Sequence, residues 1–105
     1  MFTVSFVLYE KAGIPRADAH RYWRNEHASI VKQVPGLRRY TIQLAVGAPE
    51  GEPPFLGLAS LSFDDQDAWA SAAAGPELAA GIADVPNFAD ETRLPTAFVE
   101  EITVV

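Results

Sequence analysis

The stretch YWRNEHASIVKQVPGLRRY, residues 22–40, decides the fold of this chain, because it contains most of a helix, the end of that helix and the start of a strand. At 100° per residue, Trp23, His27 and Ile30 fall on one apolar stripe of the helix. His27 therefore occupies a position where a leucine would pack better. The role of this ionisable ring is the main question that the sequence raises.

Two residues in the stretch predict where the helix ends. Pro35 disfavours a helical conformation in the residue before it, and Gly36 permits the chain to reverse. We expect one helix from about residue 15 to residue 34, because Pro15 suits a first helical turn. The strand that follows covers residues 37–46.

The remaining segments alternate between strand and helix patterns. Aromatic and β-branched runs predict strands at residues 2–9, 55–63 and 96–105. A second helix begins at residues 64–65, where an aspartate caps it, and a helical turn resumes after Gly75 and Pro76. The order β-α-β-β-α-β predicts an α+β, ferredoxin-like fold, with a four-stranded antiparallel sheet and two helices on one face.

The sheet face opposite the helices needs its own explanation. The first and third strands show no clean alternation with charged residues, and Leu56 and Leu58 stand on the parity opposite to Ala59 and Leu61. Strands that are apolar on both sides need a cover on both faces. We therefore expect a homodimer in which two such sheets face each other.

Length and composition limit the class of protein. The 105 residues suit a single domain, residues 1–105. A net charge of -6 argues against nucleic acid or anionic lipid as a partner. No apolar run reaches the ~20 residues of a membrane span, and the first ten residues do not resemble a signal peptide. We expect a cytoplasmic protein, and the lack of cysteine excludes thiolate chemistry.

Two interpretations of His27 remain open from the pattern alone. A buried histidine is often a core residue whose ring bonds a carbonyl or hydroxyl, and it can also be a general base. His20 lies near the helix start, where we expect it at the rim of a cleft. The two rings are separated by about 10.5 Å of helical rise, too far to share a metal ion. We therefore predict no metal site.

At this point the residues resemble a known family. The combination of YW and EHA in the helix, followed by VPGLRRY, resembles the EthD family. The strand that opens at Phe2, the NFAD of residues 87–90 and the terminal FVEE are also similar to that family. The resemblance spans essentially the whole chain. It implies a dimeric α/β barrel in which Trp23, His27 and Tyr40 line a cleft between helices and sheet.

We expect lyase or isomerase chemistry that needs no cofactor, and the resemblance has limits in predicting the reaction. Relatives include a methylmuconolactone methylisomerase, which uses a thiol that this chain lacks, and fungal polyketide decarboxylases or dehydratases. Family members often have HAPLV where this chain has HASIV, with Ser29 in place of proline. We therefore expect a straighter helix there. His27, followed by Tyr40, is the proton-transfer residue that the resemblance supports.

Two functions follow from these residues. As an enzyme, the protein would use His27 as base and Tyr40 as hydrogen-bond donor, with lyase, isomerase or oxygenase chemistry on an apolar carbonyl or lactone metabolite. As a binding or accessory protein, it would hold the metabolite without reaction, and haem ligation through His27 or His20 is a less favoured variant. Arg16 and Arg39 are the two candidates to pair with a substrate carboxylate. The residues expected to contact the ligand are Trp23, His20, Ile30, Phe6 and Ile42.

Overall fold

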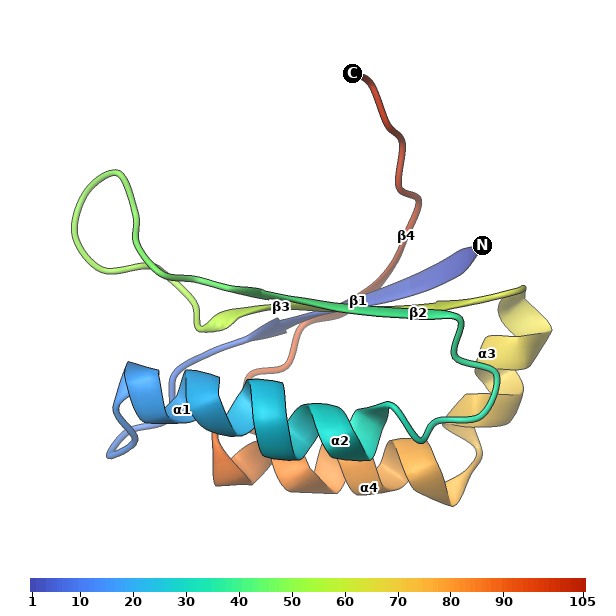
Figure 1. Cartoon of the computed structure of the whole chain (residues 1–105), viewed down its shortest axis with the longest axis horizontal. Coiled ribbons are helices and arrows are strands. Elements are labelled where there is room, and N and C mark those ends of the chain that lie inside the picture. The colour runs from blue at the N-terminus through green and yellow to red at the C-terminus, as the bar shows by residue number, and fades with distance from the viewer.

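The computed structural model describes all of residues 1–105 and has two layers, a sheet and a set of helices on one of its faces (Figure 1). The strands are β1 (Phe2–Leu8), β2 (Arg39–Leu44), β3 (Gly57–Phe63) and β4 (Thr96–Val99). They are antiparallel to their neighbours and lie in the order β2-β3-β1-β4. This is the ferredoxin-like arrangement that the sequence predicts.

The first helical segment is one continuous rod made of three parts. These are α1 (Arg16–Tyr22), a π-helical turn η1 (Trp23–His27) and α2 (Ala28–Val31). The predicted single helix to residue 34 is therefore interrupted by the π turn, and its last helical residue is Val31. The Ser29 hydroxyl donates to the Asn25 carbonyl at 2.7 Å, inside this segment. Gly36, with a φ of 79°, turns the chain into β2 as predicted.

The second helical region has two helices and a short 3-10 turn. Helix α3 (Gln66–Ala73) is capped by Asp65, whose carboxylate accepts from the Ala68 N–H at 2.8 Å. Gly75 precedes α4 (Pro76–Asp84), and the turn η2 (Val85–Asn87) follows it. Figure 1 shows α4 alongside α2 beneath the sheet, whereas α3 lies at one end of the sheet.

The core lies between the helices and the sheet. Alternate residues of β1 (Val4, Phe6 and Leu8) point into it, and so do Leu61 and Phe63 of β3. The indole of Trp23 is completely buried. It packs against Gly57, where an added Cβ would approach the indole carbon Cζ3 to 2.6 Å. A residue without a side chain at position 57 therefore makes room for the tryptophan against the sheet.

The opposite face of the sheet differs from the prediction. It is rich in short hydroxyl side chains and is not apolar: Thr3 bonds Ser62 at 2.7 Å, and Ser5 bonds Ser60 at 2.7 Å. Leu56, which suggested a second apolar face, precedes β3 and is fully buried. The apolar argument for a dimer therefore loses Leu56 but keeps Leu58, which pairs with Val7 on this face, and β1 and β3 carry no charged residue.

The last strand is shorter than predicted. Only residues 96–99 pair with β1, and residues 100–105 form no strand. In the observed register Val99 pairs with Thr3, and the pairing of β4 with β1 ends there. No helix in the structure has the length and apolar character needed to cross a membrane.

Candidate active site

His27 is the last residue of the π turn η1, and its ring points into the core, with 6% of the residue exposed. A π turn contains about one residue more than an α turn, so residues after it are rotated back by roughly 100°. Val31 therefore takes the core-facing position that regular helix geometry would give to Ile30. Turns of this kind are frequent at functional sites because they re-aim single side chains.

The His27 ring is held by a buried carboxylate from the opposite helix. His27 Nδ1 lies 2.8 Å from Oδ2 of Asp84, the last residue of α4. The other oxygen of Asp84 accepts from the Tyr22 hydroxyl at 2.7 Å and from the Asn87 amide at 2.9 Å. Three donors thus fix the carboxylate, and the carboxylate fixes the imidazole.

The protonation states in this cluster follow from its environment. Burial lowers the pKa of His27 below its ordinary 6.5, although the Asp84 carboxylate acts in the other direction. Burial alone would raise the pKa of Asp84, but hydrogen bonds from Tyr22, Asn87 and His27 outweigh it and lower the pKa. Near neutral pH, an ionised Asp84 therefore faces a neutral His27. The proton of that imidazole is on Nδ1, so Nε2 carries a lone pair.

Phe88 supports the imidazole from the side. Its ring centroid lies 4.6 Å from that of His27 and 5.6 Å from that of Trp23, and Phe88 is completely buried. The segment around Phe88 is tied to the end of β1, because the Asp90 N–H donates to the Tyr9 carbonyl at 3.0 Å. The imidazole is thus fixed both by its carboxylate and by aromatic packing.

Nε2 of His27 has no hydrogen-bond partner in the protein, and the ring lines a small pocket between the sheet and the helices. The pocket volume is about 40 Å³, enough for a few atoms. Its lining is apolar apart from two groups, the imidazole of His27 and the hydroxyl of Tyr40. The lining residues are Phe6, Leu8, His27, Val31, Tyr40, Ala59, Leu61, Leu78, Gly81, Ile82, Val85 and Leu94.

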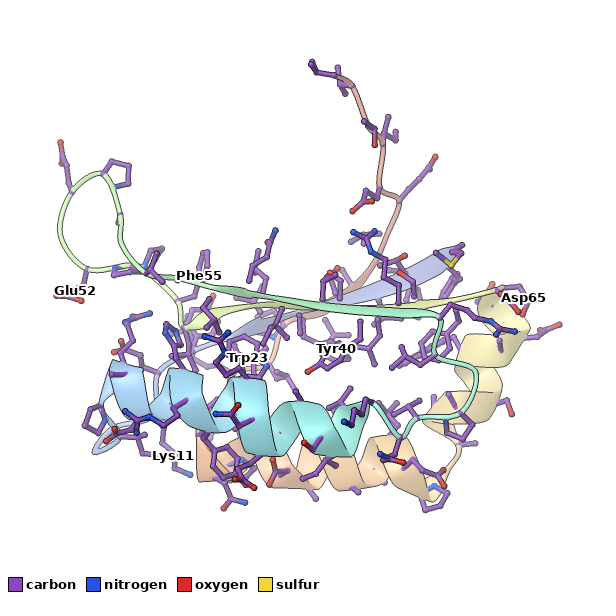
Figure 2. The ribbon with its side chains drawn as sticks, viewed as in Figure 1. Lys11, Trp23, Tyr40, Glu52, Phe55 and Asp65 are labelled. Atoms are coloured by element: carbon purple, nitrogen blue, oxygen red, sulfur yellow. The ribbon has the colours of Figure 1, made fainter.

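Tyr40 and Trp23 bring two buried donors to the layer between helices and sheet, where Figure 2 shows both side chains. Neither the Tyr40 hydroxyl nor the Trp23 indole N–H makes a hydrogen bond. Burial raises the pKa of Tyr40, and the nearby indole N–H partly offsets this. Buried donors without acceptors are rare in native proteins, and water or a ligand is the usual explanation. The Tyr40 hydroxyl is therefore a buried donor without an acceptor, on a residue that lines the pocket.

The predicted site residues separate into two groups. His27, Tyr40 and Phe6 meet in one pocket. Trp23, His20, Ile30 and Ile42, which the sequence analysis also predicted as ligand contacts, do not line this pocket.

Each of these differences has a local cause. Trp23 is buried against Gly57, and the π turn moves Ile30 out of the core-facing position. Ile42 lies two residues along β2 from Tyr40, about 7 Å away. His20 bonds the Leu56 carbonyl through Nε2 at 2.9 Å, so its ring has a structural partner.

Neither candidate arginine faces the pocket. Arg16 forms an ion pair with Glu10, and its guanidinium donates to the carbonyls of Ala45 and Phe55 at 3.1 and 3.0 Å. It therefore fastens the two ends of the loop between β2 and β3. Arg39 lies on the opposite face of the sheet, paired with Glu101 at 3.1 Å. A substrate carboxylate in the pocket would find no arginine partner.

The sequence analysis missed the carboxylate. Asp84 lies 57 residues from His27 and ends a helix whose other residues are mostly small or apolar. The signal available was IADVPNF, where an aspartate follows an apolar helical stripe and precedes a proline. An acidic residue on the buried face of a helix requires a partner, and His27 was the ionisable residue already assigned to the core.

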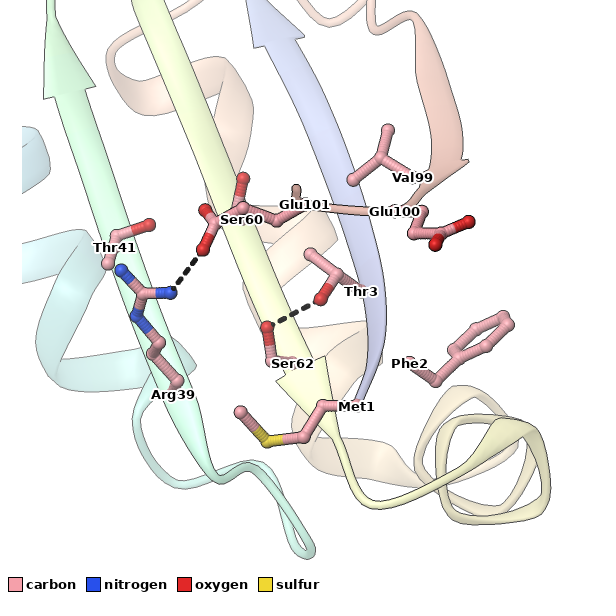
Figure 3. A pocket seen from close by; sticks show the side chains of 10 residues that line it. All are labelled: Met1, Phe2, Thr3, Arg39, Thr41, Ser60, Ser62, Val99, Glu100 and Glu101. Carbon is pink, nitrogen blue, oxygen red and sulfur yellow. Dashed lines mark hydrogen bonds and ion pairs between the residues drawn. The ribbon is translucent and has the colours of Figure 1, made fainter. Parts of the chain in front are cut away.

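A second and larger hollow lies on the far face of the sheet and is drawn in Figure 3. Its volume is about 580 Å³, and its lining includes Thr3, Thr41, Ser60, Ser62 and the Arg39–Glu101 pair. This hollow has a mostly polar lining that contains no histidine or tyrosine. The helix-side pocket is the better candidate for an active site, because a fixed imidazole and a tyrosine with an unpaired hydroxyl both line it.

Comparison with known proteins shows the family of this chain. The model of the EthD domain matches residues 11–92. The chain belongs to the EthD family. The matched range includes the whole first helical segment, β2, and the His27, Asp84 and Phe88 cluster. Among curated proteins, none matches this EthD chain significantly.

Several solved structures share the fold. An ethyl tert-butyl ether D (EthD) family protein from Bacillus halodurans C-125 is 27% identical, with a TM-score of 0.79, and the match covers 97% of this chain and 100% of that one. A dimeric ferredoxin-like protein of unknown function from Thermobifida fusca YX is 11% identical, with a TM-score of 0.72 over 93% and 88% of the chains. A putative antibiotic biosynthesis monooxygenase from Deinococcus radiodurans is 17% identical, with a TM-score of 0.66 over 100% and 96% of the chains.

Proposed function

We propose that this EthD chain is a small-molecule enzyme that performs acid–base chemistry on an apolar carbonyl or lactone metabolite. In this reaction Nε2 of His27 accepts a proton from the carbon next to the carbonyl, and Tyr40 donates a hydrogen bond to the carbonyl oxygen as it becomes an enolate. Asp84 orients the ring and stabilises the imidazolium that forms. Return of the proton to another carbon gives isomerisation, and departure of a leaving group gives a lyase reaction.

The observation that carries this proposal is the orientation of His27. The ring of a structural histidine usually bonds a backbone acceptor, as the His20 ring bonds the Leu56 carbonyl. His27 instead bonds an anchored carboxylate through Nδ1, and its ring lines an apolar pocket that Tyr40 also lines. Because its pKa is lowered, the ring is neutral near pH 7 and able to accept a proton.

The pocket restricts what can react. It is apolar and lacks an arginine, so the substrate part that enters should be uncharged. Its volume of about 40 Å³ is well below the several hundred Å³ of typical ligand sites. We therefore expect the reacting end of a small substrate to enter first. Ile82, which lines the pocket and is 44% exposed, should move to admit the rest.

Two variants of this function use the same pocket. Cofactor-free oxygenation of an electron-rich phenol needs the same base, and the Deinococcus radiodurans neighbour is described as a putative monooxygenase. A non-catalytic binding or accessory role would use the apolar lining and Tyr40 alone. We also propose that the chain works as a homodimer through the sheet face, as the description of the Thermobifida fusca neighbour as dimeric supports.

Solvent-deuterium exchange tests the enzyme function without knowledge of the natural substrate. A panel of small ketones, lactones and phenols is incubated with the protein in D₂O, and NMR follows exchange next to the carbonyl. We expect exchange of at least one compound, a loss of roughly 100- to 10,000-fold in His27→Gln, and a smaller loss in Asp84→Asn. His20→Gln is the matched control, because His20 lies on the same helical segment outside the pocket.

The results separate the three interpretations of His27. Binding of a panel compound that is unchanged in His27→Gln, with no exchange in the wild type, supports the binding function. Strong destabilisation of His27→Gln with no binding and no exchange supports a core histidine. Exchange in the wild type that persists in His27→Gln would remove the proposed base.

A further inference from the structure

The stripe of α4 that lines the helix-side pocket has one gap, at Gly81. Leu78, Ile82 and Val85 line the pocket together with Gly81, at the spacing of one helical face. Three of these four positions carry a large apolar side chain, whereas Gly81 carries none. Glycine is a poor helix former, so a glycine inside a nine-residue helix requires a packing or a functional explanation.

Comparison with Gly57, another buried glycine, excludes tight packing as the explanation. A Cβ added at Gly57 would collide with the Gln43 carbonyl oxygen and approach Cζ3 of Trp23 to 2.6 Å. A Cβ added at Gly81 would meet only one atom within 4 Å outside its own helix, Cγ2 of Val31 at 3.4 Å. Packing therefore requires the glycine at position 57, whereas the space beside Gly81 is open although the residue is buried.

This open space lies next to the proposed base. Helices α2 and α4 run side by side (Figure 1), and His27 bonds Asp84 across them at 2.8 Å. Val31 follows His27 by one helical turn, and Gly81 precedes Asp84 by one turn, so Val31 and Gly81 face each other in the adjacent layer. His27, Val31 and Gly81 all line the pocket. The missing side chain therefore leaves its space inside the pocket, one layer from the imidazole.

We propose that Gly81 is a specificity-determining residue, which sets the size of the carbonyl compound that the pocket admits beside His27. The pocket volume is about 40 Å³, so one added methyl group occupies a large part of it. One methylene group more or less in an apolar pocket changes selectivity by roughly 10- to 200-fold. The inference rests on the proposed function for the class of ligand, an uncharged carbonyl compound, and adds the limit on its size.

A series of cyclic ketones from cyclobutanone to cycloheptanone tests the size limit. NMR titration gives the dissociation constant of each ketone, and deuterium exchange is followed in the same samples. Gly81→Ala should weaken binding of the largest ring that the wild type binds by roughly 10- to 200-fold more than binding of the smallest. Adding Val31→Ala should restore the larger ring, because it removes the methyl groups that face position 81. Ala80→Gly, at an exposed position of the same helix, is the matched control and should keep the wild-type size profile.

Thermal unfolding distinguishes a size limit from a packing requirement. Gly81→Ala should be at least as stable as the wild type, because alanine favours the helix, whereas Gly57→Ala should be clearly less stable. A loss of stability in Gly81→Ala as large as that in Gly57→Ala overturns the proposal. An unchanged size profile in Gly81→Ala, or a wild type that binds no ketone of the series, also overturns it. A wild type that shows the size limit in binding but catalyses no exchange keeps this role of Gly81 and rejects the proposed base chemistry.

Discussion

The two halves of the first helical segment use their histidines in different ways. In α1, His20 bonds the Leu56 carbonyl, and Arg16, one turn earlier, bonds the carbonyls of Ala45 and Phe55. This half fastens the loop between β2 and β3. In η1, His27 bonds the buried Asp84, and its ring lines a pocket. The difference shows that the partner of a ring, more than its burial, separates a structural histidine from a candidate base.

The two partners differ in what they require. A backbone carbonyl accepts a hydrogen bond from His20 and needs no further support. The Asp84 carboxylate is charged and buried, so it needs several donors, and Tyr22 and Asn87 supply them. The hydrogen bonds around His27 therefore depend on one another more than those around His20. Disruption of the His27 network should lower the free energy of unfolding more.

The largest effect is expected from Asp84→Ala. The substitution leaves three donors, from His27, Tyr22 and Asn87, without their acceptor. An unsatisfied buried donor costs roughly 1–3 kcal/mol, so we expect a total loss of about 3 kcal/mol or more. Urea unfolding should show this loss in the free energy of unfolding. Asp84→Asn, which keeps the shape and part of the hydrogen bonding, should lose clearly less. Equal stability of Asp84→Ala and the wild type would mean that the network contributes little.

A smaller effect is expected from Tyr22→Phe. The substitution removes one of three donors to Asp84, and a hydrogen bond to a charged group contributes about 1.5 kcal/mol. The Asn87 amide still bonds the same carboxylate oxygen, so the carboxylate should stay ionised and His27 should stay oriented. Urea unfolding measures the loss. A Tyr22→Phe loss as large as that of Asp84→Ala would indicate that the hydroxyl, and not the imidazole, holds the carboxylate.

The fold was predictable because strand alternation and the helical stripe depend on near neighbours in the sequence. The period of two placed Phe6 and Tyr40 correctly on the helix side of the sheet. The helical period of 3.6 residues did not place Ile30 correctly, because a π turn shifts the side chains that follow it around the helix axis. No residue type predicts a π turn reliably. The same reasoning overextended the last strand, since the pairing of β4 with β1 ends at Val99.

The candidate site was half predictable for a related reason. His27 stood out because a titratable group interrupted an apolar stripe. Asp84 stood out less, because its partner lies on another helix and carboxylates at the end of a helix are usually solvated. The pairing of His27 with Asp84 depends on α4 lying beside the first helical segment. Tertiary packing of that kind cannot be predicted from the local hydrophobic period of the sequence.

In α1, loss of the His20 hydrogen bond should have a modest effect on stability. His20→Ala removes one hydrogen bond to the Leu56 carbonyl, and neutral hydrogen bonds contribute about 1 kcal/mol. Arg16 still holds the loop at Ala45 and Phe55, so the fold should persist. Thermal and urea unfolding measure the change, and hydrogen exchange at residues 45–56 should increase. A loss of any panel activity in His20→Ala comparable with His27→Gln would undo the distinction between the two histidines.

The smallest and most selective effect is the pH dependence of stability. Burial lowers the pKa of His27. As pH falls below 6.5, His27 therefore becomes protonated in the unfolded chain while it is still neutral in the folded chain. Stability should therefore fall with pH in this range and stop falling once pH passes below the folded pKa. Asp84 acts in another range, because its pKa is lowered below 3.8 and its stabilisation is lost only as pH falls through that lower value.

Urea unfolding of wild type and His27→Gln between pH 5 and pH 8 isolates the His27 contribution. The wild type should lose stability relative to the variant below about pH 6.5, while the two should run parallel above pH 7. The same proton should produce the acidic limb of any pH–rate profile. A wild type that instead gains stability relative to the variant as pH falls would show that the Asp84 charge outweighs burial. The resting imidazole would then be protonated, and His27 would act as an acid instead of a base.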